Sequence, residues 1–322
     1  MPEWLVEHGF GETRAALVDN GEIVEARIEL SGVLREGSII AARLVSSGID
    51  GRNAVARDDH GAEYLLPKGA PGVTEGKSLH IQITREHIPG PENWKRARAR
   101  VADCALHPVP RLAQRLGVAE RVVPRPIDDL ADAGWNDLIE QASSGLVRFA
   151  GGELRICATP AMIVIDVDGT LARDELAVRG AEEAAKSIRR LDIGGSIAID
   201  LPTTEGKVAR QAAAEAIDRH LPLPFERTAV NGFGLVQIIR PRRRASLIDL
   251  AQERAGFEAR ALLWRAAFEP PGAKRLVANP AVTAALGFHP AWLDFLARAV
   301  GGTVELRADP SLPMSGGYAE NG

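Results

Sequence analysis

The chain has 322 residues, a net charge of −4, 45% hydrophobic residues and 25% charged residues. This composition is ordinary for a globular protein of roughly two or three domains, and the acidic balance excludes a generic binder of polyanions. Cys104 and Cys157 are the only cysteines, too few for a disulfide framework or a four-thiolate zinc site. No apolar run approaches the ~20 residues of a transmembrane helix, and no signal pattern opens the chain. The sequence therefore predicts a soluble, cytoplasmic protein without a membrane span.

Short strands dominate the first part of the sequence. Residues 3–30 predict strands that include a hairpin turn at Asp19-Asn20-Gly21. Residues 36–88 continue as short strands of even spacing, which is typical of a small β-barrel. Residues 105–129 are rich in Pro and Arg and predict a connector with one short helix.

Alternating strands and helices follow over residues 153–243, which is typical of an α/β domain. One apolar run ends in Asp166 and a second ends in Asp200, and residues 179–191 between them predict a helix. The right-handed crossover of such a βαβ unit makes the two strands parallel, so both carboxyl ends lie at one sheet edge. Further expected elements are a helix near 136–146, a helix over 290–299, and strands over 275–278 and 303–306.

Asp166 and Asp200 are candidate metal ligands. Two carboxylates at one edge of a sheet repel each other, and a hard cation relieves that repulsion. Mg²⁺ prefers a few carboxylates and keeps waters and phosphate oxygens as its other ligands, and Mn²⁺ is an alternative. Either Asp alone is better explained as the cap of a turn. Because a crossover helix links the two, the pair predicts a metal site that activates water at a phosphate.

A competing motif overlaps this site. The segment 165–171, IDVDGTL, is similar to the first motif of haloacid-dehalogenase-like phosphatases, in which the first Asp is a nucleophile and the second a general acid. That family also needs a later strand ending in Ser or Thr, a Lys and an acidic pair. Asp200 ends its strand where Ser or Thr would stand. The phosphatase is kept as an alternative.

Longer stretches resemble the bacterial ribonuclease E/G family. Residues 137–171 look like its helix, Gly-Gly hairpin and T-x-A-hh-x-ID-x-N strand, and residues 181–206 resemble its R-x-L-GG-hh-hID strand. Residues 230–248, VNGFGLVQIIRPRRRASLI, resemble its NGF…GLVE-x-TR-x-R-x-R-x-SL segment. Residues 273–282 and 304–313 look like its small C-terminal domain. The resemblance is strong over about 137–250 and faint over 36–130, where residues 36–88 take the place of the family's RNA-binding barrel.

The resemblance implies a Mg²⁺-dependent endoribonuclease that cleaves single-stranded RNA. By position, Asp166 and Asp200 match the residues that hold the catalytic Mg²⁺. Asp168 falls where the family usually has an Asn that contacts the scissile phosphate, and an Asp there repels that phosphate unless it is protonated or joins the metal shell. Tyr64 matches an aromatic residue on which an RNA base stacks, and Lys95 matches a basic residue after the barrel. The full set of implied RNA-binding residues is Tyr64, Lys95, Arg96, Arg98, Arg240, Arg242 and Arg243.

The chain looks like a shortened member of that family. The segment that senses a 5′-monophosphate has no counterpart between about 105 and 130. No cysteine follows Cys157, so the two-cysteine zinc link has no counterpart and zinc is not expected. A homodimer is left open as a partner state. A non-catalytic RNA-binding protein on the same scaffold is a further alternative.

The implied fold is an α/β (α+β) fold with a ribonuclease H-like/DNase I-like catalytic core, an inserted OB-type barrel and a small C-terminal α/β domain. The implied domains are N-terminal strands packing on the catalytic core over 1–34, the RNA-binding barrel over 35–90, a basic and Pro-rich connector over 91–135, the catalytic α/β domain over 136–255 and the C-terminal domain over 256–322.

Overall fold

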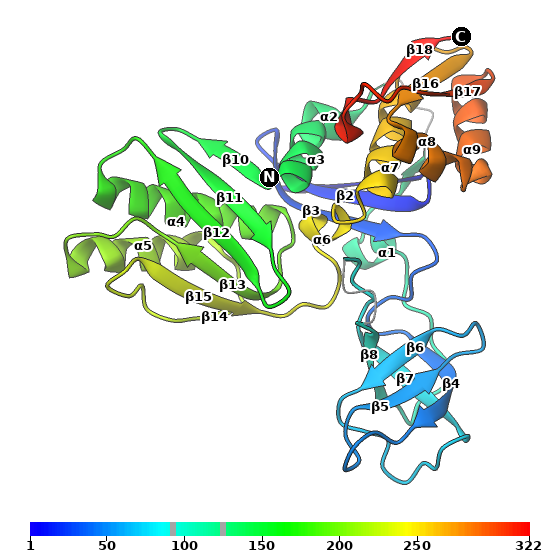
Figure 1. The fold of residues 1–322 in the computed structure, drawn as a ribbon, viewed down its shortest axis with the longest axis horizontal. Helices are drawn as coiled ribbons and strands as arrows, with labels where there is room; N and C mark the ends of the chain where they lie inside the picture. Colours follow the sequence, from blue (N-terminus) through cyan, green and yellow to red (C-terminus); the bar gives the residue numbers. More distant parts are fainter. Residues whose placement is uncertain (91–94, 123–126) are drawn as a thin grey trace. The chain divides into compact units, whose positions relative to one another are not determined.

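The computed structural model describes residues 1–90, 95–122 and 127–322, and the chain forms two compact units (Figure 1). The first unit contains residues 1–31, 112–241 and 246–322, and the second contains residues 32–111 and 242–245. The expected connector over 91–135 includes residues 91–94 and 123–126, which lie outside the described residues. The five-part division expected from the sequence stays a prediction.

A four-stranded sheet in the order β3-β2-β1-β9 opens the first unit. Its strands are β1 (Glu3–Gly9), β2 (Glu12–Asp19), β3 (Glu22–Leu30) and β9 (Arg121–Val122). Asn20 and Gly21 both have positive φ, at 52° and 83°, as a two-residue hairpin turn that matches the twist of its strands requires. The predicted hairpin is confirmed. The short helices α1 (Leu112–Leu116) and α2 (Asp129–Asp132) also belong to this unit.

A six-stranded mixed sheet carries the predicted βαβ unit. Its order is β10-β11-β12-β13-β15-β14, with β10 (Leu146–Phe149), β11 (Gly152–Ala158), β12 (Ile163–Gly169), β13 (Gly195–Asp200), β14 (Glu226–Arg227) and β15 (Leu235–Arg240). Helix α3 (Trp135–Ser144) precedes it, helix α4 (Arg173–Arg190) connects β12 to the parallel strand β13, and helix α5 (Lys207–His220) follows. The other pairings among these strands are antiparallel, and β12 runs three residues past Asp166 because β11 pairs with it as far as Gly169.

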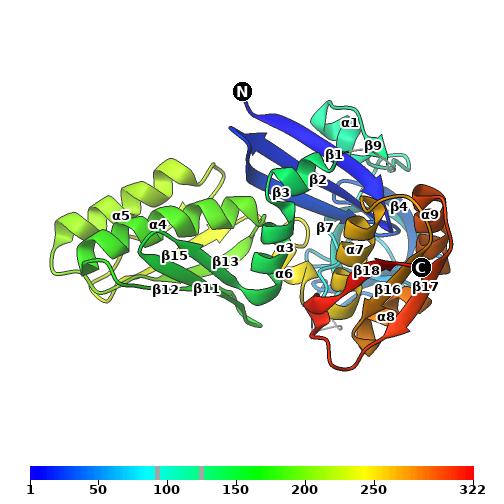
Figure 2. The same ribbon diagram turned by 90° about the horizontal axis from the view of Figure 1, so that it is seen from above.

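The two faces of this sheet differ sharply in burial. Helices α4 and α5 cover one face (Figure 2), where Ile165 and Val167 are buried. Gly180 of α4 touches this face so closely that a Cβ there would stand 2.3 Å from Cγ1 of Val167. Alternate residues of a strand point to opposite faces, so Asp166 and Asp168 lie on the other, open face.

A three-stranded sheet in the order β17-β16-β18 ends the first unit. Its elements are α6 (Leu247–Leu250), α7 (Arg254–Ala267), β16 (Lys274–Ala278), α8 (Pro280–Gly287), α9 (Pro290–Val300), β17 (Val304–Ala308), a short 3₁₀ helix (Met314–Gly316) and β18 (Tyr318–Asn321). The strands and the helix expected over 275–306 are confirmed, whereas α8 and β18 were not expected. Asn279 caps α8 by accepting a hydrogen bond from the backbone N–H of Ala281, and Pro280 occupies its first turn.

A buried charged network ties β2 to α7 within this unit. The carboxylate of Glu12 accepts hydrogen bonds from Nε of Arg260 at 2.8 Å and from Nε1 of Trp264 at 2.9 Å. Arg14, whose guanidinium carbon lies 3.8 Å from the centroid of a Trp264 ring, pairs with the buried Glu7. These side chains are buried but satisfy one another, as buried charges need to.

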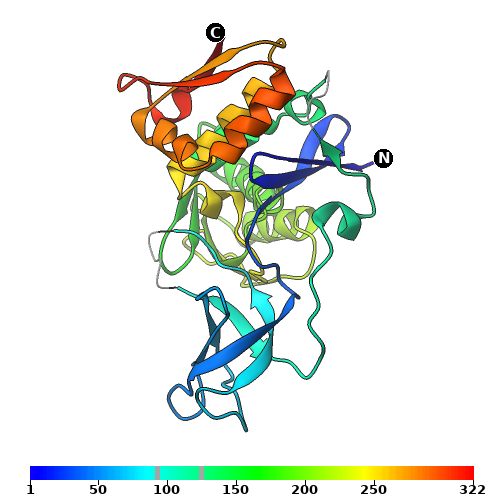
Figure 3. The same ribbon diagram turned by 90° about the vertical axis from the view of Figure 1, so that its right-hand side faces the viewer.

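The second unit is built on a closed five-stranded barrel (Figure 3). Its strands follow the order β4-β5-β6-β8-β7, with β4 (Ile39–Ser46), β5 (Ala54–Arg57), β6 (Glu63–Leu66), β7 (Ser78–Arg85) and β8 (Ala97–Val101). The inward-facing residues form a core that includes Leu44, Leu66, Ile81 and Ile83. The small barrel expected from residues 36–88 is confirmed, and β8 completes it. Within the described ranges, none of the helices combines the length and apolar character that crossing a membrane requires.

Candidate functional site

Asp166 and Asp200 are brought side by side. They are register partners in the parallel pairing of β12 with β13. Backbones paired in this way lie about 4.8 Å apart, and partners in register point to the same face. Asp168, two residues further along β12, shares that face. The structure therefore groups the three acidic residues expected in the catalytic site. It places them on the open face of the sheet, with only Asp200 at the end of its strand.

The electrostatics of the group follow from this placement. Burial raises the pKa of the Asp166 carboxyl above its ordinary value, and the nearby charges of Asp168 and Asp200 raise it further. A backbone hydrogen bond from Val167 and the charge of Arg155 lower that pKa and oppose the shift. Arg155 lies opposite Asp166 on β11, and its Nη2 also donates to Glu153 at 2.7 Å. The open face thus concentrates negative charge that a bound cation would relieve.

The donor set of this site suits a hard cation. Among the residues that the structure describes, no group of three or more His, Cys, Asp or Glu side chains is arranged to hold a metal ion. The protein therefore offers the pair Asp166 and Asp200 rather than a closed cage. Mg²⁺ commonly binds one or two carboxylates and fills its shell with waters and phosphate oxygens, so the pair fits this ion.

A loop next to Asp200 presents an exposed aromatic ring that is not among the site residues expected from the sequence. Phe233 is 83% exposed and stands two residues before Leu235, the register partner of Asp200. Asn231 Oδ1 accepts hydrogen bonds from the N–H groups of Phe233 at 2.9 Å and Leu235 at 3.1 Å. Gly234 has a φ of 96°, and a Cβ there would lie 2.0 Å from the carbonyl oxygen of Leu201. These contacts stabilise the loop conformation. The segment NGFG at residues 231–234 was the feature of the sequence that could have indicated this loop.

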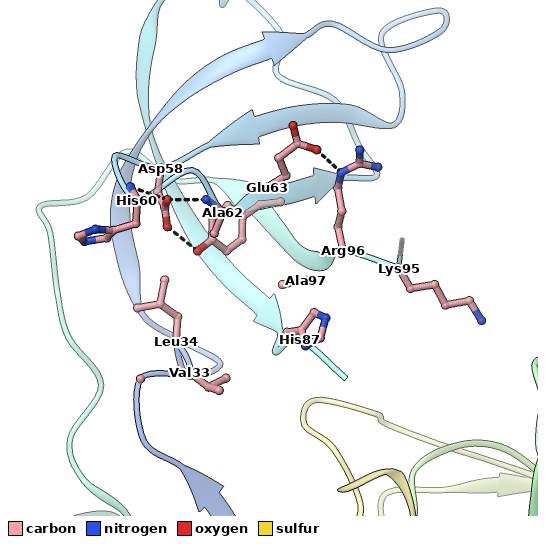
Figure 4. Close-up of a pocket in the computed structure, with 12 residues that line it drawn as sticks. Val33, Leu34, Asp58, His60, Ala62, Glu63, His87, Lys95, Arg96 and Ala97 are labelled. Carbon is pink, nitrogen blue, oxygen red and sulfur yellow. Dashed lines mark hydrogen bonds and ion pairs between the residues drawn. The ribbon is translucent and has the colours of Figure 1, made fainter. Parts of the chain in front are cut away.

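The second unit contains a hollow of about 750 Å³ that several of the expected RNA-binding residues line (Figure 4). Its lining includes Tyr64, His87, Lys95 and Arg96. Tyr64 is only 5% exposed, and its hydroxyl donates to Asp58 at 2.8 Å. The ring packs in the barrel core while the residue also lines the hollow, and its role in stacking on RNA stays a prediction. Inward-facing positions of β6 alternate, and position 64 falls on the inner side.

The basic residues of the hollow are partly neutralised. Nε of Arg96 donates to Glu63 at 2.7 Å, and Nη2 of Arg57 donates to the other oxygen of the same carboxylate at 2.6 Å. Hydrogen bonds from Arg57 and Arg96 lower the pKa of Glu63, so it stays charged. In Figure 4 the side chain of Lys95 extends away from Glu63 and Arg96.

The remaining expected RNA-binding residues fall in both units. Arg98 is exposed on β8, and Arg242 and Arg243 belong to the segment 242–245 of the same unit. Arg240 ends β15 in the other unit, where its Nη1 donates to the carbonyl of Ile193 at 3.0 Å. The structure thus gathers six of the seven expected residues in the barrel unit and leaves Arg240 on the sheet that carries the carboxylates.

No protein-family model and no curated protein matches this chain. The resemblance to ribonuclease E/G therefore stays a proposal.

The raised pKa of Asp166 predicts how cation binding depends on pH. A cation binds the carboxylate and not the protonated acid, so Mg²⁺ or Mn²⁺ binding is lost as the pH falls through the raised pKa of Asp166. Asp168→Asn removes one repelling charge and lowers that pKa. The acid limit of binding, which is the pH below which the cation no longer binds, therefore moves to lower pH. Mn²⁺ titrations at a series of pH values measure this limit. Asp294→Asn, an exposed change on α9, is the control and leaves the limit unchanged. A limit that stays in place in Asp168→Asn contradicts the prediction.

Proposed function

We propose that the chain is a Mg²⁺-dependent endoribonuclease that cleaves single-stranded RNA, as a shortened member of the ribonuclease E/G family. The observation that carries this proposal is the register pairing of Asp166 with Asp200 on an open sheet face. The family-like sequence around both residues and the barrel unit with its basic residues add support. Such a face leaves room for a flexible strand, whereas a closed cleft would select small substrates.

The residues of this face have distinct tasks in the proposed reaction. Mg²⁺, when bound, supplies an activated water and neutralises charge at the reacting phosphate. Asp166 and Asp200 would hold the ion from neighbouring strands. Asp168, exposed beside them, repels an approaching phosphate unless it is protonated or shares the ion. Phe233 offers a ring on which an unpaired base can stack, a contact that tolerates any sequence.

The finer fold assignment belongs to the same proposal. A parallel pair of strands joined by a crossover helix, beside an antiparallel hairpin and with helices on one face, supports the ribonuclease H-like/DNase I-like core. The closed five-stranded barrel supports the OB-type assignment for the second unit, and the sheet of β16 to β18 with its helices supports the small C-terminal domain.

One observation favours a second candidate, a non-catalytic RNA-binding protein on the same scaffold. Asp168 adds an exposed carboxylate to the face where the family usually has an amide, and that extra charge opposes an incoming phosphate. RNA binding through the barrel unit does not need the carboxylate face.

Cleavage assays on the purified chain separate these functions. We expect cutting of an A/U-rich single-stranded RNA with Mg²⁺ or Mn²⁺ and little turnover of p-nitrophenyl phosphate. Tight RNA binding without cleavage, unchanged in Asp200→Ala, would instead support the non-catalytic protein. Rapid p-nitrophenyl phosphate turnover that is lost in Asp166→Asn would support the haloacid-dehalogenase-like phosphatase.

A further inference from the structure

Two arginines of the barrel unit face each other across neighbouring strands. Arg85 ends β7 and Arg98 lies on β8, and the two are register partners. Like charges placed directly opposite in an antiparallel pair destabilise it. An arrangement that works against folding needs a compensating partner, either within the protein or from a ligand.

The protein does not supply that partner among its described residues. Nη2 of Arg85 donates to the carbonyl oxygen of Arg96 at 3.0 Å, while its Nε is buried without a hydrogen-bond partner. Arg98 forms no ion pair within the described ranges. Three carboxylates of this unit pair with other arginines: Glu63 with Arg57 and Arg96, Glu86 with Arg35, and Glu36 with Arg243.

A third arginine joins the pair from a distant part of the sequence. Arg242 belongs to the segment 242–245, which is anchored on this unit because the N–H of Glu86 donates to the carbonyl of Arg243 at 2.8 Å. Burial, together with the nearby charges of Arg98 and Arg242, lowers the pKa of Arg85 to about 10. The three arginines therefore gather positive charge at this point of the barrel unit.

We propose that Arg85, Arg98 and Arg242 form a binding site for a phosphate group of the RNA backbone. Guanidinium groups bind phosphate oxygens through paired, charge-assisted hydrogen bonds, and an anion here would offset the repulsion between the arginines. The site adjoins the hollow of the barrel unit, because Arg85 bonds the backbone of Arg96 and Arg96 lines that hollow. A strand with a base in the hollow would carry a phosphate to this site. Taking RNA as the source of the phosphate rests on the proposed function.

Salt dependence of RNA binding tests the site directly. The full chain is titrated with a cleavage-inert 2′-O-methyl RNA of about 12 nucleotides, without divalent cations, between about 50 and 200 mM salt. Each lost phosphate contact reduces the slope of log affinity against log salt by about 0.7 for a single strand. We expect Arg98→Gln and the double variant Arg85→Gln/Arg98→Gln to reduce the slope by about this amount and the affinity by about tenfold. Arg98 is exposed, so the single variant keeps the fold.

Arg52→Gln is the matched control, since it removes the same charge from an exposed loop of the same unit. We expect its slope to equal that of the wild type. Equal slopes for Arg98→Gln, the double variant and the wild type would overturn the site. Inorganic phosphate forms a second arm: if it binds the wild type and not the double variant while RNA affinity is the same in both, the site takes free phosphate and the RNA assignment is overturned. A wild type that binds RNA with the expected slopes but never cuts it would overturn the proposed nuclease and leave this site standing.

Discussion

Asp200→Asn is expected to lower the rate of Mg²⁺-dependent RNA cleavage by about 10²- to 10³-fold, which is the usual effect of removing one preorganised group from a catalytic site. Asp200 is exposed at the end of β13, and Asp166 is its register partner. The amide keeps the size of the side chain but removes its charge, so the proposed Mg²⁺ site would lose one of its two carboxylates. The half-saturating Mg²⁺ concentration should therefore rise together with the loss of rate.

Single-stranded RNA affinity in the absence of divalent cations distinguishes this effect from damage to the fold. It should be the same in Asp200→Asn and in the wild type, because the phosphate site that we propose, formed by Arg85, Arg98 and Arg242, lies in the barrel unit. Asp294→Asn removes an exposed carboxylate from α9 of the same unit as Asp200 and should leave both cleavage and affinity unchanged. Full cleavage by Asp200→Asn would exclude Asp200 as a ligand and remove the main support for the nuclease.

Glu12→Ala is expected to lower the free energy of unfolding by about 3–5 kcal/mol, the range found when one partner of a buried ion pair is removed. Glu12 is 4% exposed and accepts hydrogen bonds from Arg260 and Trp264. Without the carboxylate, the buried guanidinium of Arg260 and the indole N–H of Trp264 lose their partner. Urea denaturation of the variant and the wild type measures the difference.

Two further variants make this stability prediction specific. In the double variant Glu12→Ala/Arg260→Ala no uncompensated charge remains. Its loss in free energy of unfolding should therefore be smaller than the sum of the losses in the two single variants. Glu25→Ala removes a carboxylate that is part-exposed on β3 and pairs with Arg27 at 2.6 Å. The free energy of unfolding of Glu25→Ala should be lower than that of the wild type by no more than about 1 kcal/mol. A cost for Glu12→Ala as small as that for Glu25→Ala would mean that water or a rearranged neighbour replaces the lost contacts.

The sequence by itself determined the features that depend on local pattern. The hairpin turn at Asn20-Gly21 was predictable because few residue types adopt the positive φ that both positions require. The pairing of Asp166 with Asp200 followed from two apolar runs and a crossover helix, because this connection makes strands parallel. Even spacing of short strands was enough to predict a barrel, and its closure through β8 is part of the structure.

Only the tertiary structure decided which side chains are open to a ligand. The carboxylates lie on an open face because α4 and α5 cover the opposite one, and β12 continues past Asp166 because β11 pairs with it. The side chain of Tyr64, which the sequence predicts to stack on RNA, is largely buried in the barrel core at the lining of the hollow. The meeting of Arg85 with Arg98 depends on the register between β7 and β8. Register, burial and face are set by partners distant in the sequence, so a local pattern does not contain them.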